Sequence, residues 1–522
     1  MKQKKNVAVF AAVLLTFALL IGCTAQAAEL APGQSVQAAQ QVAEASPSAA
    51  AGEAKAPKYV FMFIGDGMSY VQFQTASDYL GALKNPGDIL KGGEALSLMN
   101  FPVAGSATTY DSTSFCPDSA STATSIASGH KTHSGMINVD ETAQVKYETI
   151  AETLKKQLGY KIGIISTVNL NHATPAAFYA HQASRNDYYE IGLEMINSNF
   201  DFFAGGDLKD PTGSEKNQEG LFTLAKQAGY NVVISQKEAE KLTAADGKTI
   251  MIGQTLADSK SLSYDIDRKD GEWALADYVK KGIEVLNNDT GFFMMVEGGK
   301  IDWACHANDA GSTIADTIAF SKAIDEAIAF YNEHPDETLI LVTGDHETGG
   351  LTIGYAGTDY DTYLSNLQNQ KISYAQYDAQ YVAKYKAENT PFEDVLADMK
   401  ELFGLITKDD PSATEDSKLV LTDYELEQLK AAYEKTMTPK PAEGETAVEP
   451  TQAEYVLYGT YEPLSVTITH ILNNKSGINF SSYAHTGLPV PVMSMGVGQE
   501  IFSGYYDNTD IYKKTASILG IA

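Results

Sequence analysis

Six short apolar runs, separated by longer amphipathic segments, constrain the fold of this chain more than any other feature. They are four to six residues long and mostly bounded by Gly, Asp, Asn or Thr, which is typical of buried parallel strands. They lie at Tyr59–Ile64, Lys161–Ser166, Asn231–Ile234, Phe292–Val296, Thr338–Val342 and Val490–Met495. Helical spacing of apolar residues occurs between them, at Glu148–Leu158, Glu272–Leu286 and Thr313–Tyr331. We therefore predict an α/β fold of three layers, with a central, mostly parallel sheet flanked by helices.

The acidic composition restricts the partners of the chain. It has 522 residues, of which 44% are hydrophobic and 20% charged, and its formal net charge is −29. This excess of acid argues against a nucleic-acid-binding role, because phosphate backbones are bound by clustered Lys and Arg. An anionic substrate would have to be attracted by local cations, such as metal ions or a buried Arg.

The first residues have the pattern of a signal peptide, which we predict at 1–22. Three lysines precede an apolar run, Val7–Ile21, that is too short for a comfortable membrane span. The run ends at Gly-Cys, which resembles a bacterial lipobox and would leave Cys23 as a lipidated N-terminal residue. Ordinary secretion, with cleavage after Ala27, is the alternative. In both cases we expect export to the periplasm or cell surface. We expect membrane contact only through a lipid anchor at Cys23.

The segment 355–465 differs in composition from the rest of the chain. It holds 12 of the 29 tyrosines, has a net charge of −12, and shows helical patterns at Pro391–Leu405 and Leu421–Thr436 before a Pro/Glu/Thr-rich linker at 438–452. We predict that it is an inserted helical and irregular lobe. The other predicted parts are a flexible tether at 23–57 and a main domain formed by 58–354 and 466–522. We expect the two body cysteines, Cys116 and Cys305, to be buried and reduced.

Clusters of metal-ligand residues follow three of the predicted strands. Asp66 follows the first strand. Glu297 follows another and is soon followed by Asp302 and His306, and Asp345 and His346 follow a third. Because the carboxyl ends of parallel strands form the crevice where ligands bind, these clusters are brought to one edge of the sheet. Each cluster alone would be weak evidence for a functional site, since a lone Gly-Asp-Gly is usually a turn and a lone His is often a core residue.

The residue types in these clusters suit divalent cations. Asp302 and His306 share a helical face and, with another His, make a zinc site that leaves one position open. Asp66, Asp345 and His346 make a second, more oxygen-rich site. Glu297 suits a third, harder ion such as Mg²⁺. His485, in His-Thr-Gly, could supply the missing nitrogen ligand.

A helix of small residues carries the candidate nucleophile. Pro117 and Asp118 suit its start and Gly129 its end, so Ser119 lies in the first turn, where backbone amides favour an anion. A serine hydroxyl is a poor nucleophile until it loses its proton, and a metal is the expected activator. The alternative is a packing helix in which Ser119 is a cap. Further along, Arg185 could grip two phosphate oxygens, or lie on a solvated helix face.

Taken together, these motifs resemble those of alkaline phosphatases, in the same order from about residue 58 to 520. The strings are Gly-Asp-Gly-Met, Pro-Asp-Ser-Ala with Ala-Ser-Gly-His-Lys-Thr, His-Ala-Thr-Pro-Ala-Ala, Glu-Gly-Gly-Lys-Ile-Asp, Gly-Asp-His-Glu-Thr-Gly-Gly and His-Thr-Gly. The resemblance implies that the main domain is catalytic and hydrolyses small phosphate monoesters. It implies that Ser119 becomes a phosphoserine, that Arg185 clamps the phosphoryl oxygens, and that Asp118 steadies this Arg.

The resemblance also implies a metal set of two Zn²⁺ and one Mg²⁺. One zinc ion is held by Asp302, His306 and His485, the other by Asp66, Asp345 and His346, and the third ion by Asp66, Thr174 and Glu297. Two departures from the best-known bacterial pattern are His172, where that pattern has Asp, and Trp303, where it has Lys. Both flank the third site and the phosphate, so we expect a weakened Mg²⁺ site and faster phosphate release.

Several alternatives remain open at this point. A phosphodiesterase or another hydrolase of the same superfamily would use similar ligands, although a sulfatase would need a modification motif that Ser119 lacks. A non-catalytic surface lipoprotein would explain the N-terminus but not Ser119 and Arg185 beside the ligand positions. We expect the lobe at 355–465 to cap the site entrance or to extend the interface of a homodimer.

Overall fold

The computed structural model describes residues 56–414, 417–439 and 450–521. The predicted signal peptide, Cys23, nearly all of the predicted tether and most of the predicted linker at 438–452 lie outside these ranges. Within them, no helix combines the length and the apolarity that crossing a membrane requires. The described residues belong to one compact unit.

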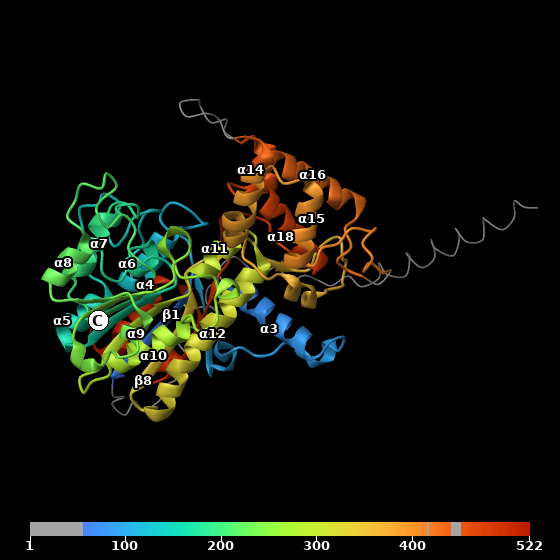
Figure 1. Cartoon of the computed structure of the whole chain (residues 1–522). Coiled ribbons are helices and arrows are strands. Elements are labelled where there is room, and N and C mark those ends of the chain that lie inside the picture. Colours follow the sequence, from blue (N-terminus) through green and yellow to red (C-terminus); the bar gives the residue numbers. More distant parts are fainter. Residues whose placement is uncertain (1–55, 415–416, 440–449, 522) are drawn as a thin grey trace, which may run out of the picture. The chain divides into compact units, whose positions relative to one another are not determined.

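A ten-stranded sheet with helices on both faces forms the centre of this unit (Figure 1). Its strand order is β14-β2-β13-β8-β1-β7-β3-β4-β6-β5. In the middle, β1 (Tyr59–Gly65) pairs in parallel with both β8 (Thr338–Gly344) and β7 (Phe292–Glu297). The other strands are β2 (Val103–Thr108), β3 (Lys161–Ser166), β4 (Phe202–Gly205), β5 (Asn231–Val233), β6 (Thr249–Ile252), β13 (Val490–Gly496) and β14 (Gly504–Asp507). The predicted mostly parallel α/β sheet is confirmed.

Two of the predicted strands differ from the expectation. The run at Val490–Met495 is antiparallel to both of its neighbours, β2 and β8, and not parallel. The reason is connectivity, because β13 begins only five residues after His485, which lies at the edge where β1, β7 and β8 end. The run at Asn231–Ile234 forms β5 at the edge of the sheet, where Asn231 is exposed, so this strand is not buried.

Side chains of β1 alternate between two cores. Tyr59, Phe61 and Phe63 belong to one core, which includes residues of α3 (Tyr70–Lys84), α10 (Leu275–Leu286) and α12 (Ala310–Glu333). Val60, Met62 and Ile64 belong to the other, with residues of α4 (Ser119–Ser128), α5 (Ile150–Leu158), α7 (Tyr188–Asn197) and α19 (Thr509–Leu519). Because successive side chains of a strand point to opposite faces, a strand that is apolar throughout requires a helix layer on each face.

The segment predicted as a lobe is mainly helical. It contains α13 (Tyr374–Tyr377), α14 (Ala383–Glu388), α15 (Phe392–Phe403), α16 (Asp423–Met437), α17 (Gln452–Tyr458) and the start of α18 (Pro463–Lys475). The side chain of Thr422 caps α16, as its sequence suggests. Helices α15 and α16 pack on α18, and Figure 1 shows these elements gathered together. The expected boundary at residue 465 falls inside α18, and the division into catalytic domain and lobe stays a prediction.

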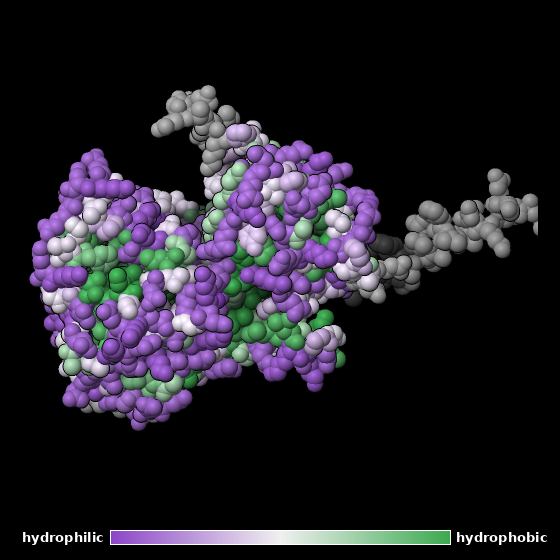
Figure 2. Space-filling view, in the orientation of Figure 1, coloured by the Kyte–Doolittle hydropathy of each residue, from purple (hydrophilic) through white to green (hydrophobic). Residues whose placement is uncertain are grey.

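The molecular surface is mainly hydrophilic on the face drawn in Figure 2, with apolar side chains in separate patches. The expectation of two buried thiols is wrong for Cys116, which is exposed, whereas Cys305 is buried and both are free. Cys116 lies in the loop before α4, next to Phe115, whose side chain is also exposed. An apolar residue type therefore did not indicate burial here, because this loop lies outside both cores.

Candidate metal centre and active site

Three neighbouring strands deliver the candidate ligands to one edge of the sheet. Asp66 follows β1, Glu297 ends β7, and Asp345 follows β8, and the register aligns Ile64 with Glu297. A close approach makes this convergence possible. A Cβ atom on Gly344, at the end of β8, would lie 1.9 Å from the carbonyl oxygen of Met68 in the loop after β1. Only glycine lets the two loops approach so closely.

The first ligand group combines one aspartate with two histidines. Asp302 and His306 lie on α11 (Lys300–His306), and His485 lies on β12 (His485–Thr486), which pairs with β9 (Glu347–Thr348) directly after β8. The Nε2 atoms of His306 and His485 are 3.0 Å apart, and they lie 3.4 and 3.5 Å from Asp302 Oδ1. Residues from two distant parts of the sequence, 302–306 and 485, therefore lie together.

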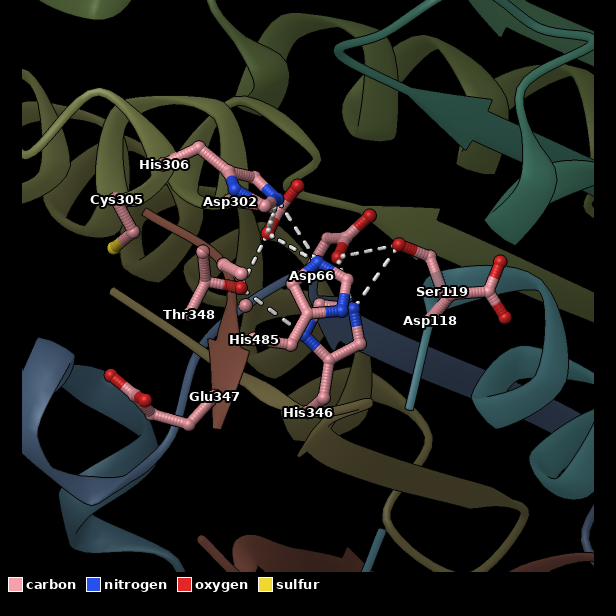
Figure 3. A network of polar contacts seen from close by, with 12 residues as sticks. Asp66, Asp118, Ser119, Asp302, Cys305, His306, His346, Glu347, Thr348 and His485 are labelled. Carbon is pink, nitrogen blue, oxygen red and sulfur yellow. Dashed lines mark hydrogen bonds and ion pairs between the residues drawn. The ribbon is translucent and has the colours of Figure 1, made fainter. Parts of the chain in front are cut away.

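The second ligand group contacts the candidate nucleophile. His346 Nε2 lies 3.2 Å from Asp66 Oδ1 and 3.4 Å from Asp345 Oδ2. The Ser119 hydroxyl oxygen is 3.1 Å from the same nitrogen and 3.5 Å from Asp66 Oδ1 (Figure 3). All four side chains are buried. The hydroxyl is thus held directly against potential metal ligands.

A third group lies on the other side of Asp66. Ligand atoms of Asp66, His172 and Glu297 lie within 4.8 Å of one another. Thr174 donates a hydrogen bond to Asp66 Oδ2 at 3.2 Å, and Ser166 donates to Glu297 Oε2. The other carboxylate oxygen of Glu297, Oε1, is buried without a hydrogen-bond partner. A buried carboxylate oxygen is costly unless it is paired, so this atom favours a cation.

The histidines of the first two groups are oriented by their second nitrogen. His306 Nδ1 donates to the carbonyl oxygen of Tyr483 at 2.6 Å, and His485 Nδ1 donates to that of Pro117. His346 Nδ1 lies 3.2 Å from the hydroxyl oxygen of Thr348. In each case Nε2 faces the ligand group, which is the arrangement that metal-binding histidines require. The donor set therefore fits metal ions. Three groups of ligand atoms lie close enough to hold one: Asp302, His346 and His485; Asp66, Asp345 and His346; and Asp66, His172 and Glu297.

The electrostatics of the site also favour bound cations. Asp66, Glu297, Asp302 and Asp345 are buried, and among the described residues no Lys or Arg forms an ion pair with them. Burial and the neighbouring Asp66 carboxylate raise the pKa values of Glu297 and Asp345 well above the usual range. A cluster of buried carboxylates that lacks basic partners indicates that cations complete it.

Helix α4 positions the remaining groups. Ser119 is its first residue, and the Asp118 side chain caps it by accepting from the Ser121 amide at 3.0 Å. Asp118 also accepts from Arg185 at 2.8 Å, and although burial opposes the effect, this guanidinium lowers the pKa of Asp118 to about 2. Arg185 donates in turn to His172 Nε2 at 3.1 Å. The chain thus fixes Arg185 beside Ser119 from two sides.

A pocket of about 360 Å³ opens above these groups. Ser119, Arg185, His172, Trp303 and the ligands Asp302, His306 and His485 line it. Four further lining residues, Asp258, Ser259, Tyr374 and Tyr461, were not predicted from the sequence. Asp258 and Ser259 lie on a short turn and had no sequence signal. Tyr374 and Tyr461 lie in the segment 355–465, where the density of tyrosines could have indicated them.

An α/β sheet whose carboxyl edge carries grouped carboxylates and histidines around a serine defines a metal-dependent hydrolase. The family model for alkaline phosphatase matches residues 57–521. The chain is 30% identical to alkaline phosphatase 3 of Bacillus subtilis over 474 residues, covering 88% of this chain and 89% of the relative. It is also 30% identical to alkaline phosphatase 4 of the same organism over 400 residues, covering 75% and 74%.

Solved structures agree with the sequence comparisons. A cold-active alkaline phosphatase from a psychrophilic Shewanella is 27% identical with a TM-score of 0.70, covering 88% of this chain and 99% of that one. The alkaline phosphatase of Thermus thermophilus has a similar fold, with a TM-score of 0.71 at 23% identity, covering 90% and 92%. The protein belongs to the alkaline phosphatase family and is a phosphoric monoester hydrolase with metal-binding residue groups.

Proposed function

We propose that this enzyme hydrolyses phosphate monoesters through a phosphoserine formed on Ser119. The observation that carries the proposal is the position of the Ser119 hydroxyl, which lies 3.1 Å from His346 in a pocket that Arg185 also lines. The oxygen of Ser119 attacks phosphorus and the ester bond to the leaving group breaks. Water then attacks the phosphoserine and releases phosphate, so two successive inversions retain the configuration at phosphorus.

The residues that would hold the metal ions are those of the three groups. Asp302, His306 and His485 suit one zinc ion, Asp66, Asp345 and His346 suit a second, and Asp66, Thr174 and Glu297 suit a magnesium-type ion. When bound, the ions supply Lewis-acid stabilisation of the attacking and departing oxygens and lower the pKa of the attacking group. The inward Nε2 atoms and the unpartnered Glu297 oxygen support this assignment.

The other side chains bind and orient the phosphoryl group. The guanidinium of Arg185 can donate two hydrogen bonds to the phosphoryl oxygens, while Asp118 and His172 hold it in place. The N-terminus of α4 adds backbone N–H groups that favour the anion. These contacts support a monoester substrate with free oxygens. The alternative, a phosphodiesterase or another hydrolase of the superfamily, would need space beside Arg185 for a second ester group.

Export, anchoring and assembly are further parts of the proposal. The signal-peptide pattern at 1–22 supports secretion, and the lipobox supports lipidation at Cys23 and a position in the periplasm or at the cell surface. We propose small phosphate monoesters as substrates, no nucleic-acid-binding role, and a homodimer as the assembled form. Tyr374 and Tyr461 line the pocket, which supports the role of the segment 355–465 in covering the site entrance.

The test is hydrolysis of p-nitrophenyl phosphate by the wild type and Ser119→Ala, with chelator and with Zn²⁺ and Mg²⁺ restored. We expect the substitution to lower kcat more than about 1,000-fold, because removing a nucleophile removes a whole reaction step. Chelation should abolish the wild-type activity reversibly. Comparable rates on bis-p-nitrophenyl phosphate, or full activity of Ser119→Ala, would contradict the proposal.

A further inference from the structure

The outer part of the pocket, beyond the reacting groups, has an aromatic wall. Trp303 lies on α11, and Tyr374 and Tyr461 come from the segment 355–465. The rings of Tyr374 and Tyr461 meet edge to face, with centroids 5.5 Å apart. Behind them, the fully buried Tyr264 lies 5.9 Å from Tyr374, and their hydroxyl oxygens are 3.3 Å apart. The wall is therefore supported by packing and holds its shape without a ligand.

A buried lysine contacts both the aromatic side chains and an acidic residue that lines the same pocket. Lys300 Nζ lies 3.6 Å from the ring centroid of Tyr264 and 4.8 Å from that of Trp303, which is one helical turn further along α11. It also pairs with Asp258 at 2.8 Å and donates to the Ser261 hydroxyl at 2.9 Å. Lys300 is fully buried and does not line the pocket, so its charge holds Asp258 in place and does not face a substrate.

The turn that carries Asp258 is held in a strained conformation. Ser259 and Lys260 have φ values of 48° and 70°, in the left-handed region that residues other than glycine rarely adopt. Asp207 holds the end of this turn, because its amide donates to the Lys260 carbonyl oxygen at 2.8 Å and its carboxylate pairs with Lys260 Nζ at 3.3 Å. These two contacts of Asp207 hold the strained turn in place. The turn in turn places Asp258 and Ser259 in the lining of the pocket.

We propose that this part of the pocket is a leaving-group subsite for a nucleoside, so that nucleoside monophosphates are preferred substrates. The base stacks on the wall of Trp303 and Tyr461, and sugar hydroxyls donate to the Asp258 carboxylate. The inference rests on the proposed phosphomonoesterase function and names its substrate class. The whole pocket, with the part around the reacting groups included, has a volume of about 360 Å³, at the lower end of the range for small-molecule sites, roughly 300–1,000 Å³.

The charges of the subsite favour this leaving group over others. Asp258 lines the pocket, whereas its partner Lys300 is buried and does not, so leaving groups that carry further phosphates or carboxylates meet the negative end of this ion pair and are repelled. A small aliphatic alcohol would leave the three aromatic rings without contact. A nucleoside contacts both features of the subsite, because its neutral, planar base can stack on the aromatic rings and its sugar hydroxyls can donate to the Asp258 carboxylate.

Substrate selectivity is the first test, measured as kcat/KM for a nucleoside 5′-monophosphate relative to glycerol 3-phosphate. We expect the wild type to prefer the nucleotide, and Tyr461→Ala to reduce the ratio about tenfold, the order of a lost base–aromatic stack. The matched control is Tyr360→Ala, because Tyr360 is 96% exposed and outside the pocket, and it should leave the ratio unchanged. Asp258→Asn should raise kcat/KM for the nucleoside diphosphate relative to that for the nucleoside monophosphate. A ratio unaffected by Tyr461→Ala, or an equal preference for phenyl phosphate, would overturn the inference.

Binding of adenosine, which carries no phosphate, tests the subsite independently of hydrolysis. The chain has two tryptophans, and Trp273 lies outside this pocket, so in Trp273→Phe the fluorescence reports Trp303 alone. In the metal-loaded enzyme we expect saturable quenching by adenosine, with a dissociation constant about tenfold higher when Tyr461→Ala is added. No quenching by an enzyme that hydrolyses p-nitrophenyl phosphate would overturn the subsite alone. Quenching by an enzyme without phosphatase activity would support the subsite and contradict the proposed function.

Discussion

At the scale of single residues, His172 shows how one side chain can set the balance of charge in the site. It lies between Arg185 and the third ligand group, where the related bacterial pattern has a carboxylate. Burial and the Arg185 charge lower its pKa to about 4, so the imidazole is neutral above that pH. Its Nε2 accepts from Arg185, and its Nδ1 is buried without a partner. The third group therefore holds one negative charge fewer than it would with an aspartate.

His172→Asp should strengthen the third site. The added carboxylate should lower the Mg²⁺ concentration for half-maximal activity about tenfold, since ligand-shell changes alter metal affinity by this order. It should also make phosphate release slower, which would appear as stronger inhibition by inorganic phosphate. Activity titrated with Mg²⁺ and with phosphate provides both measurements. His172→Asn is the neutral control, and equal behaviour of the two variants would show that charge at this position is unimportant.

At the scale of elements, the start of α4 joins helix stability to catalysis. Asp118 both caps the helix and pairs with Arg185, while the small residues of α4 are all buried. Such a helix has no solvated face and tolerates little change. The sequence predicted its two ends correctly, because a capping residue and a glycine in the left-handed region, Gly129, carry local signals.

Two substitutions of Asp118 should separate its two roles. Asp118→Asn keeps an acceptor for the helix cap but removes the charge, and Asp118→Ala removes both. We expect both variants to raise KM, because Arg185 loses its ionic partner. Thermal unfolding should show that Asp118→Ala loses about 1 kcal/mol more than Asp118→Asn, the usual contribution of a cap. Equal stability of the two variants would contradict the capping role.

The elements also show where sequence reasoning is limited. Strands such as β1 and β8 were predicted because they are apolar throughout and buried on both faces. Strand β2 was missed because its sequence, Val-Ala-Gly-Ser-Ala-Thr, consists mainly of small and polar residues. The reason lies in its neighbour, since a Cβ atom on Gly105 would lie 2.0 Å from the carbonyl oxygen of Phe502. Close approach between distant segments selects such residues, and no local pattern reveals it.

The residues of the candidate site also fall into those that the sequence could predict and those that it could not. Asp66, Glu297 and Asp345 could be predicted because each lies at the carboxyl end of a strand, and a parallel sheet gathers such ends. Asp258 and Tyr461 could not, because they reach the pocket from a strained turn and from a helical segment whose packing is set by tertiary contacts. The reactive centre was thus predictable from topology, whereas the wall that faces the leaving group depended on the three-dimensional structure.

At the scale of the whole molecule, buried acids outside the metal groups couple stability to pH. Asp378, after α13, has one carboxylate oxygen that is buried without a partner, and burial raises the pKa of this group to about 7. The unfolded chain releases this proton near pH 3.8. Between these values the folded state holds a proton that the unfolded state has lost, so stability falls as pH rises and stays lowered above pH 7.

Asp378→Asn should therefore stabilise the protein most at high pH. We expect it to raise Tm by at least about 2 °C at pH 8.5, with a difference that shrinks towards pH 4. Differential scanning calorimetry across this range measures the effect. The control is Glu388→Gln, which removes an exposed acid on α14. If the gain in Tm is the same at every pH, Asp378 is not the titrating group.

Strand β13 lies between β8 and β2, and among the described strands it alone joins β2 and β14 to the other seven. It is formed by residues 490–496, just after His485 supplies a nitrogen to the first ligand group. A ribosome must therefore translate residues 485–496 before β2 and β14 can join the sheet and the ligand group is complete. Translation products that end before residue 485 would lack both β13, which joins the two parts of the sheet, and His485 of the first ligand group.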